Sequence, residues 1–301
     1  MRSKASLEAK ERYMCSPRVM EKVGSEVTRR AFLGMLGAAA AVAGASCGPV
    51  GSGARSPAQE EVRSVADTGL EVRDLTHTVS PEFPVFPGYP PMEISRHFTI
   101  ERDTSNAYTL ALIEHTGTHL DAPFHFAADG LTADLIPPER LLAPLAVLDI
   151  SERAKADEDA RVEPEDILAW EERHGPLPAG AFVGMYSGWE ARLSDPETFV
   201  NLDSSGRPHW PGFGAEAAEF LVNERDVVGI GVDTLSLDLG ASREFGAHRS
   251  VLPAGKYGLE NLANLGEVSE AGARIVVGGP KHEGATGGPA RVFALTGELL
   301  G

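Results

Sequence analysis

The chain has few cysteines and few basic residues for its length. Its 301 residues include two cysteines, Cys15 and Cys47, both close to the N-terminus, so no disulfide framework can hold the rest of the chain together. Lys and Arg number 27 against 44 Asp and Glu, a formal net charge of −17. This acidic balance argues against nucleic acids or anionic membrane surfaces as partners.

Several catalytic and structural signatures are also missing from the sequence. It contains no internal repeat, no coiled-coil heptad and no phosphate-binding glycine loop. Ser187-Gly188 is not part of a Gly-x-Ser-x-Gly nucleophile elbow, and no cysteine follows position 47. Chemistry through a covalent serine or cysteine intermediate is therefore not indicated.

Long hydrophobic runs are absent too. The apolar run Met35 to Ala45 has eleven residues, whereas a membrane-spanning helix needs about 20. Arg29-Arg30 stands shortly before this run, which is typical of a twin-arginine export signal. We therefore expect export to the periplasm or another extracytoplasmic space.

Three segments follow from this layout. We expect residues 1–47 to form the export signal. It ends either at the small-x-small site Ala43-Gly44-Ala45 or by lipoprotein processing at Cys47, and we favour the second. A lipid on Cys47 would be the only membrane attachment. Residues 48–68 are rich in Gly, Ser, Pro, Ala and Glu and predict a flexible tether. Residues 69–301 are long enough for one domain with a sizeable core.

The most informative stretch of the sequence is a cluster of histidines. Three histidines and an aspartate lie within eleven residues, namely His115, His119, Asp121 and His125. Imidazole and carboxylate groups suit zinc or manganese. A single histidine is more often a surface or hydrogen-bonded core residue, but tight clustering of this kind favours a metal site.

The backbone of this cluster must bend. In a straight strand His115 and His119 would lie about 13 Å apart, too far to share one ion through bonds of about 2.1 Å. Gly117 and Pro123 argue against an uninterrupted helix. We therefore predict a strand that ends near Glu114, followed by an ordered loop that bends at Gly117.

A second pair of metal-competent residues lies downstream. His248 and Glu260 are twelve residues apart. Taken alone, such a pair is most often solvated surface, since charged side chains are rarely buried.

The two clusters together resemble the bacterial cyclase-like metal-dependent hydrolases, which include kynurenine formamidases and isatin hydrolases. The family pattern His-x-Gly-Thr-His-x-Asp-x-Pro-x-His is complete here from His115 to His125, and the later His and Glu match as well. Other similar pieces are Asp74-Leu-Thr-His77, Phe86-Pro-Gly88, Ser187-Gly-Trp189, Gly231-Val-Asp-Thr234 and Gly287-Gly-Pro-Ala-Arg291. The resemblance extends from about residue 70 to residue 298.

The resemblance implies a role for each site residue. His115, His119 and Asp121 would bind one Zn²⁺ or Mn²⁺ ion. Asp121, His248 and Glu260 would complete a second, adjacent position, so one or two ions bind per subunit. His125 would be the acid/base that protonates the leaving amine after metal-activated water attacks an amide.

The resemblance also points to the substrate side of the site. Phe86 occupies the aromatic position before Pro-Gly that faces the substrate in the family. Kynurenine formamidases typically carry Trp there, and this chain has Phe86 followed by Tyr89. The small-molecule amide substrate therefore need not be formyl-kynurenine.

Hydrophobic patterns predict a mixed α/β domain in which strands dominate. The expected strands are Val72–His77, Ile94–Ile100, Thr109–Glu114, Leu145–Ile150, Ala181–Tyr186, Val227–Val232, Arg274–Val277 and Arg291–Thr296. The expected helices are Pro164–His174, Ala215–Asn223 and Leu259–Leu265, and the acidic run Ser151 to Glu165 reads as a solvated loop and helix start. The resemblance implies a swivelling β/β/α fold and a homodimer or higher homo-oligomer.

Three functions remain open at this point. The first is an exported metal-dependent amidohydrolase. The second is hydrolysis of a lactone or other cyclic ester with the same site. The third is a non-catalytic, extracytoplasmic solute-binding module. His125 favours an enzyme, because a binding module needs no acid/base beside a full set of ligands.

Overall fold

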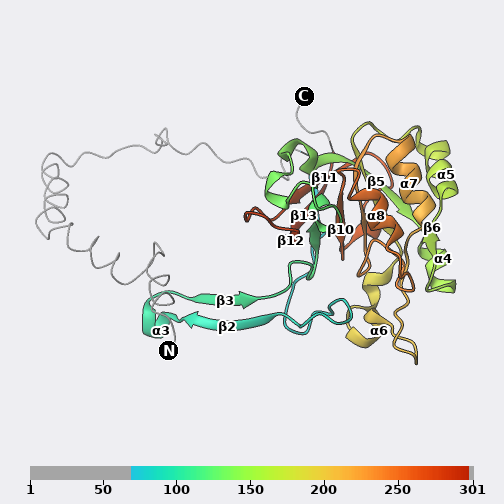
Figure 1. Ribbon diagram of the computed structural model, residues 1–301. Coiled ribbons are helices and arrows are strands. Elements are labelled where there is room, and N and C mark those ends of the chain that lie inside the picture. Colours follow the sequence, from blue (N-terminus) through green and yellow to red (C-terminus); the bar gives the residue numbers. More distant parts are fainter. Residues whose placement is uncertain (1–68, 298–301) are drawn as a thin grey trace, which may run out of the picture. The chain divides into compact units, whose positions relative to one another are not determined.

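The computed structural model describes residues 69–297 as a strand-rich mixed α/β domain (Figure 1), as expected. The strands are β1 (Glu71–Asp74), β2 (Glu93–Phe98), β3 (Ala107–Ala111), β4 (His119–Asp121), β5 (Leu142–Asp149), β6 (Arg161–Val162), β7 (Ala181–Tyr186), β8 (Gly212–Phe213), β9 (Val227–Val232), β10 (Tyr257–Glu260), β11 (Ala273–Gly278), β12 (Gly287–Pro289) and β13 (Arg291–Thr296). The α-helices are α3 (Ile100–Asp103), α4 (Ser151–Ala156), α5 (Pro164–His174), α6 (Pro196–Val200), α7 (Ala215–Glu224) and α8 (Gly246–Val251). Short 3-10 helices are η4 (Pro123–His125), η5 (Ala133–Leu135), η6 (Pro138–Leu141), η7 (Trp189–Arg192) and η8 (Leu265–Glu267).

One nine-stranded sheet organises the domain, in the order β1-β13-β11-β5-β7-β9-β10-β4-β12. Its central strands β5, β7, β9 and β10 run parallel, and the outer strands are antiparallel to their neighbours. Parallel strands are covered on both faces, which is why β7 and β9 are almost entirely apolar and buried.

Each face of the sheet has its own hydrophobic core. Side chains alternate along β7, so Phe182 packs into one core while Val183 and Met185 pack into the other. Helices α5, α7 and α8 cover the second core, where Trp170 and Leu221 are buried (Figure 1).

Many predicted elements are confirmed. The bounds of β7, β9, β13 and α5 are those expected from the sequence, and α7 extends one residue beyond its expected end. Helix α5 begins where predicted because Glu163 and Asp166 form a reciprocal capping box and Pro164 occupies the first helical position. The acidic run from Ser151 contains the short helix α4 and strand β6. Helix α8 was not predicted.

The helix predicted over Leu259–Leu265 is wrong. Residues 257–260 form strand β10, which lies between β4 and β9 with Leu259 opposite Leu120 and Gly231. All four residues of β10 are buried, and β10 is paired with β4 on one side and with β9 on the other. This strand pairing outweighs the local helix propensity. Only the short 3-10 helix η8 begins near the end of the predicted range.

The histidine cluster also differs from its prediction in one respect. The predicted strand Thr109–Glu114 is shifted, because β3 ends at Ala111. A new short strand, β4, then begins within the cluster itself. The bend between them occurs at Gly117, whose φ of 71° lies in the left-handed region, as predicted.

Strands β2 and β3 form a separate two-stranded hairpin with exposed residues along most of its length. Ile94 lies opposite Leu110 and Arg96 opposite Tyr108, so these side chains share one face. Ser95 and Thr109 lie on the other face. The hairpin is thus amphipathic, with a largely apolar face that no other strand of the described residues covers.

The predicted export signal, lipid site at Cys47 and tether all lie in residues 1–68, outside the described residues. Among residues 69–297, no helix has both the length and the apolar character needed to cross a membrane.

Candidate metal centre

The site is built on strand β4, which lies between β10 and β12 and runs antiparallel to both. The register places Glu260 of β10 opposite His119. His248 reaches the same place from helix α8, and it is buried like the others. Strand pairing therefore brings the two sequence clusters together.

Glycines on both neighbouring strands make room for Asp121. Gly258 and Gly287 are its partners in the two ladders. A Cβ on Gly258 would lie 3.2 Å from Asp121 Oδ2 and 2.7 Å from Leu237 Cδ1. A Cβ on Gly287 would lie 2.3 Å from the Leu120 carbonyl oxygen and 2.8 Å from His115 Cε1. Larger residues would displace the backbone or the site side chains.

The two carboxylates are shared between two histidines. His119 Nε2 lies 3.3 Å from Asp121 Oδ1 and 3.2 Å from Glu260 Oε2. His248 Nε2 lies 3.4 Å from Asp121 Oδ2 and 3.2 Å from Glu260 Oε1. Four ligands around an ion with bonds of about 2.1 Å stand about 3.4 Å from one another in a tetrahedron. The distance from each histidine nitrogen to one oxygen of each carboxylate matches that spacing, and the ligand-type atoms of His119, Asp121 and Glu260 all lie within 4.8 Å of one another.

Hydrogen bonds aim both imidazoles at the carboxylates. His119 Nδ1 donates a hydrogen bond to the Gly117 carbonyl oxygen at 2.8 Å. Nδ1 carries the proton, because a carbonyl oxygen can only accept a hydrogen bond. His248 Nδ1 lies 2.6 Å from Asp238 Oδ2. Such partners orient histidine ligands and leave Nε2 free to bind an ion. Asp238 was not among the residues predicted from the sequence.

Unpaired polar atoms support the same interpretation. His119 Nε2 and Asp121 Oδ2 are buried and have no hydrogen-bond partner among the described residues. Buried polar groups are nearly always satisfied, so a missing partner has to be explained. A cation between the imidazoles and the carboxylates explains both atoms.

The electrostatics favour a cation. Burial lowers the pKa of His119, but the adjacent Asp121 carboxylate outweighs it and raises that pKa to about 10. Burial raises the pKa of Asp121, but the charge of His119 and the hydrogen bond with His115 hold it well below its usual value. Two buried carboxylates thus create a negative potential that a positive charge must balance.

His115 contacts the same aspartate, at the oxygen that His119 also approaches. Its Nδ1 lies 2.6 Å from Asp121 Oδ1 and its Nε2 lies 3.0 Å from Thr286 Oγ1. The Thr286 hydroxyl donates to Glu114 Oε2 at 2.5 Å. Thr286 and Glu114 therefore orient His115. Thr286 was not identified from the sequence because 171 residues separate it from His115.

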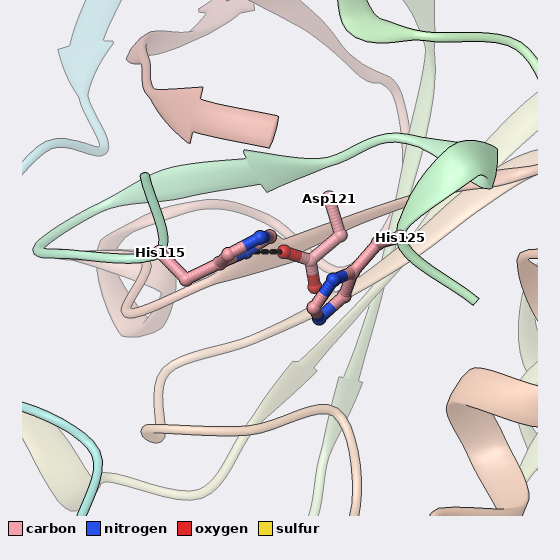
Figure 2. A group of neighbouring side chains, drawn as sticks. All are labelled: His115, Asp121 and His125. Carbon is pink, nitrogen blue, oxygen red and sulfur yellow. Dashed lines mark hydrogen bonds and ion pairs between the residues drawn. The ribbon is translucent and has the colours of Figure 1, made fainter. Parts of the chain in front are cut away.

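His125 stands beside this group, on the 3-10 helix that follows β4. Its ring stacks on His115 with centroids 3.9 Å apart, and Figure 2 shows both rings turned toward Asp121. Ligand-type atoms of these three residues lie within 4.8 Å of one another. Burial lowers the pKa of His125 to about 4, so the ring is neutral at pH 7 and can accept a proton.

A cavity of about 140 Å³ opens onto the histidines. That volume is similar to one that holds a single benzene ring. Its walls include Phe86, Tyr89, Phe126, Phe245, His115, His125, His248 and Glu260. Phe86 is held by an edge-on contact with Trp210 at 5.8 Å between ring centroids. The structure therefore brings all seven predicted site residues to one place, while their individual roles stay predictions.

Comparison with known proteins places the chain among its relatives. The family model described as "Putative cyclase" matches residues 73–239. An isatin hydrolase from Roseibium aggregatum is 35% identical over 246 residues, which cover 75% of this chain and 92% of that protein. A kynurenine formamidase from Geobacillus thermodenitrificans is 26% identical over 190 residues, covering 63% and 80% of the two chains.

Solved structures show the same relationship. A crystal structure of an isatin hydrolase bound to the product analogue thioisatinate superposes with a TM-score of 0.73 and 29% sequence identity, covering 90% of this chain and 100% of that one. Fold and site together define a metal-dependent hydrolase. The chain belongs to the cyclase-like family of these enzymes.

Proposed function

We propose that this protein hydrolyses the amide C–N bond of a small aromatic substrate, an aryl formamide or a cyclic amide, with Zn²⁺ or Mn²⁺ as cofactor. The observation that carries the proposal is the pair of buried carboxylates, Asp121 and Glu260, each shared between His119 and His248. The cavity beside them has the volume of one aromatic ring. The similar proteins named isatin hydrolase and kynurenine formamidase support this choice of bond.

Five residues would hold one or two ions: His115, His119, Asp121, His248 and Glu260. When bound, the metal supplies an activated water at neutral pH and polarises the substrate carbonyl. Asp121 and Glu260 offer all four carboxylate oxygens to this region, although Glu260 Oε1 also accepts a hydrogen bond from the Leu237 amide at 2.8 Å. That bond fixes the orientation of the Glu260 carboxylate.

His125 moves the proton. Because its imidazole is neutral at pH 7, a ring nitrogen can accept the proton that the attacking water loses. The same nitrogen then donates to the departing amine nitrogen, which must be protonated before it can leave. Phe86 and Phe126 line the cavity and would hold the aromatic ring of the substrate while restricting water.

The test combines metal analysis with a substrate screen. The purified protein should contain zinc or manganese and should hydrolyse N-formyl-arylamines or isatin-type cyclic amides, with lactones as the competing class. His119→Ala should lose metal and activity together. The matched control is His174→Ala, because His174 pairs with Glu270 rather than with the site. Full metal content and turnover in His119→Ala would remove the proposed centre, and metal binding without turnover of any class would favour a solute-binding module.

We also propose export by the twin-arginine route with a lipid on Cys47. Replacing both Arg29 and Arg30 with lysine should leave the precursor in the cytoplasm, as detected by fractionation. Cys47→Ser should release the product from membranes. Unchanged export of the double variant contradicts the signal, and unchanged membrane association contradicts the anchor.

We further propose that two copies of the chain pack through the β2–β3 hairpin. A two-stranded hairpin is at best marginally stable alone, and on this one Tyr108 and Leu110 are 55% and 54% exposed. Leu110→Glu should shift the molar mass measured by light scattering from oligomer to monomer. Thr109→Glu, on the opposite face, should not. A monomeric wild type, or equal effects of the two variants, contradicts the proposal.

A further inference from the structure

Asn261, which was not among the predicted site residues, has a buried side chain in the wall of the catalytic cavity. It directly follows Glu260 at the end of β10 and is 2% exposed. Its backbone is in the left-handed conformation, with a φ of 53°. Its backbone amide donates to the Thr234 carbonyl oxygen at 2.9 Å, and its carbonyl oxygen accepts from the Thr118 hydroxyl at 2.5 Å. Hydrogen bonds at both backbone groups therefore fix the residue in place.

The side-chain amide of Asn261 is paired at one end and unpaired at the other. Its Nδ2 group donates to the Gly117 carbonyl oxygen at 3.0 Å. Because a carbonyl oxygen only accepts, the NH₂ group must face Gly117, and Oδ1 must point away from it. Oδ1 is buried and has no hydrogen-bond partner among residues 69–297. A buried acceptor without a donor has to be explained.

The cation that explains the unpaired atoms of His119 and Asp121 does not require this oxygen. The carboxylates of Asp121 and Glu260 already bring oxygens to both histidine nitrogens of the centre. A side-chain amide oxygen is neutral and can only accept, so the partner that it needs is an N–H or O–H group. Because no residue from 69 to 297 supplies one, the donor has to come from a molecule bound in the cavity.

We propose that Asn261 Oδ1 accepts a hydrogen bond from the N–H group of the reacting amide and thereby selects amides over lactones and other esters. The catalytic test of this inference rests on the proposed amide hydrolysis. An ester carries an oxygen, itself an acceptor, where the amide carries N–H, so an ester leaves Oδ1 unpaired. When His125 gives its proton to the departing nitrogen, that nitrogen becomes positively charged and its N–H donates more strongly. The hydrogen bond therefore stabilises the transition state more than the bound substrate.

The catalytic test compares a cyclic aryl amide with the lactone in which an oxygen atom replaces its N–H group. Asn261→Gly removes the acceptor, and glycine adopts the left-handed backbone without strain. In this variant kcat/KM for the cyclic amide should fall about 10- to 100-fold more than kcat/KM for the lactone, as expected when a buried hydrogen bond is lost. Damage to the fold or to the metal centre would lower both values alike, so the ratio of the two isolates the effect of the acceptor.

Asn264→Gly is a closely matched control. Asn264 also has a left-handed backbone, with a φ of 55°, and its Nδ2 donates to the Asp74 carbonyl oxygen at 2.8 Å. It does not line the catalytic cavity, so this variant should keep the wild-type ratio of the two kcat/KM values. A wild-type ratio in Asn261→Gly, or an equal change of the ratio in both variants, would overturn the proposal.

A binding measurement separates this inference from the reaction. Indole and benzofuran share one ring outline, differ by N–H against oxygen at the same position, and contain no bond to hydrolyse. In calorimetric titrations the wild-type protein should bind indole about tenfold more tightly than benzofuran; Asn261→Gly should lose this difference and Asn264→Gly should keep it. If this pattern holds but neither the cyclic amide nor the lactone is hydrolysed, the proposed reaction fails and the acceptor stands. If the cyclic amide is hydrolysed but indole and benzofuran bind alike or not at all, the proposal for Asn261 fails alone.

Discussion

Asp238→Asn should weaken metal binding without removing any proposed ligand. Asp238 Oδ2 lies 2.6 Å from His248 Nδ1, and its carboxylate also accepts backbone hydrogen bonds from Ala247 at 2.8 Å and from His248 at 3.2 Å. Asparagine has one acceptor oxygen and an NH₂ group. If that NH₂ faces His248 Nδ1, the ring must accept there and carry its proton on Nε2, which removes the lone pair aimed at the ion.

Loss of such a partner typically reduces metal affinity 10- to 100-fold, or by about 1.4–2.7 kcal/mol. The assay is an equilibrium titration of metal-free protein with Zn²⁺ or Mn²⁺ in competition with a chelating indicator. Asp233→Asn is the matched control, since buried Asp233 accepts hydrogen bonds from Ser187 and Trp189 and touches no proposed ligand. Both variants should lose about 1–3 kcal/mol of unfolding free energy, but only Asp238→Asn should lose affinity. Wild-type affinity in Asp238→Asn, or an equal loss in Asp233→Asn, would refute the reasoning.

Three further predictions use the same protein. His125→Ala should keep its metal while kcat falls about 10²–10⁴-fold, least for substrates with good leaving groups, and loss of metal would make His125 a ligand instead. Burial raises the pKa of Asp233 to about 6 from 3.8, against the hydrogen bonds from Ser187, so the folded state holds this proton more tightly than the unfolded one. The protonated Asp233 carboxyl therefore contributes to the free energy of unfolding below about pH 4, and this contribution is lost as pH rises through about 6. Denaturant titrations should show the loss as about 3 kcal/mol in the wild type and should not show it in Asp233→Asn. Gly287→Ala should lower the melting temperature and metal affinity because its Cβ would lie 2.3 Å from the Leu120 carbonyl oxygen, whereas Gly279→Ala, with its nearest contact at 3.4 Å, should be tolerated.

Local patterns predicted what local interactions determine. The capping box and Pro164 marked the start of α5, and apolar runs marked the buried strands β7 and β9. The histidine cluster was recognisable because its proposed metal ligands lie within one short stretch. These features depend on neighbours a few residues away, so the sequence alone was sufficient.

Features that depend on distant pairing were missed. The spacing of leucines after Gly258 suits a helix, and only the pairing of β10 with β4 and β9 makes it a strand. Asp238 has no recognisable pattern, because the turn before α8 decides that it meets His248. Thr286 likewise becomes informative only when β12 pairs with β4.

The position of β4 between two strands that come much later in the chain has a consequence for folding order. The Thr118 hydroxyl donates to the Asn261 carbonyl oxygen across 143 residues, and Pro289 pairs with His119 from the other side. Closing such large loops is slow compared with forming local structure. During synthesis the histidine cluster emerges long before its strand partners exist, so a growing or truncated chain carries the proposed ligands without the assembled site. We therefore expect metal binding at the proposed site to come at the end of folding, so that a bound ion would mark a chain whose strands β10 and β12 are already in place.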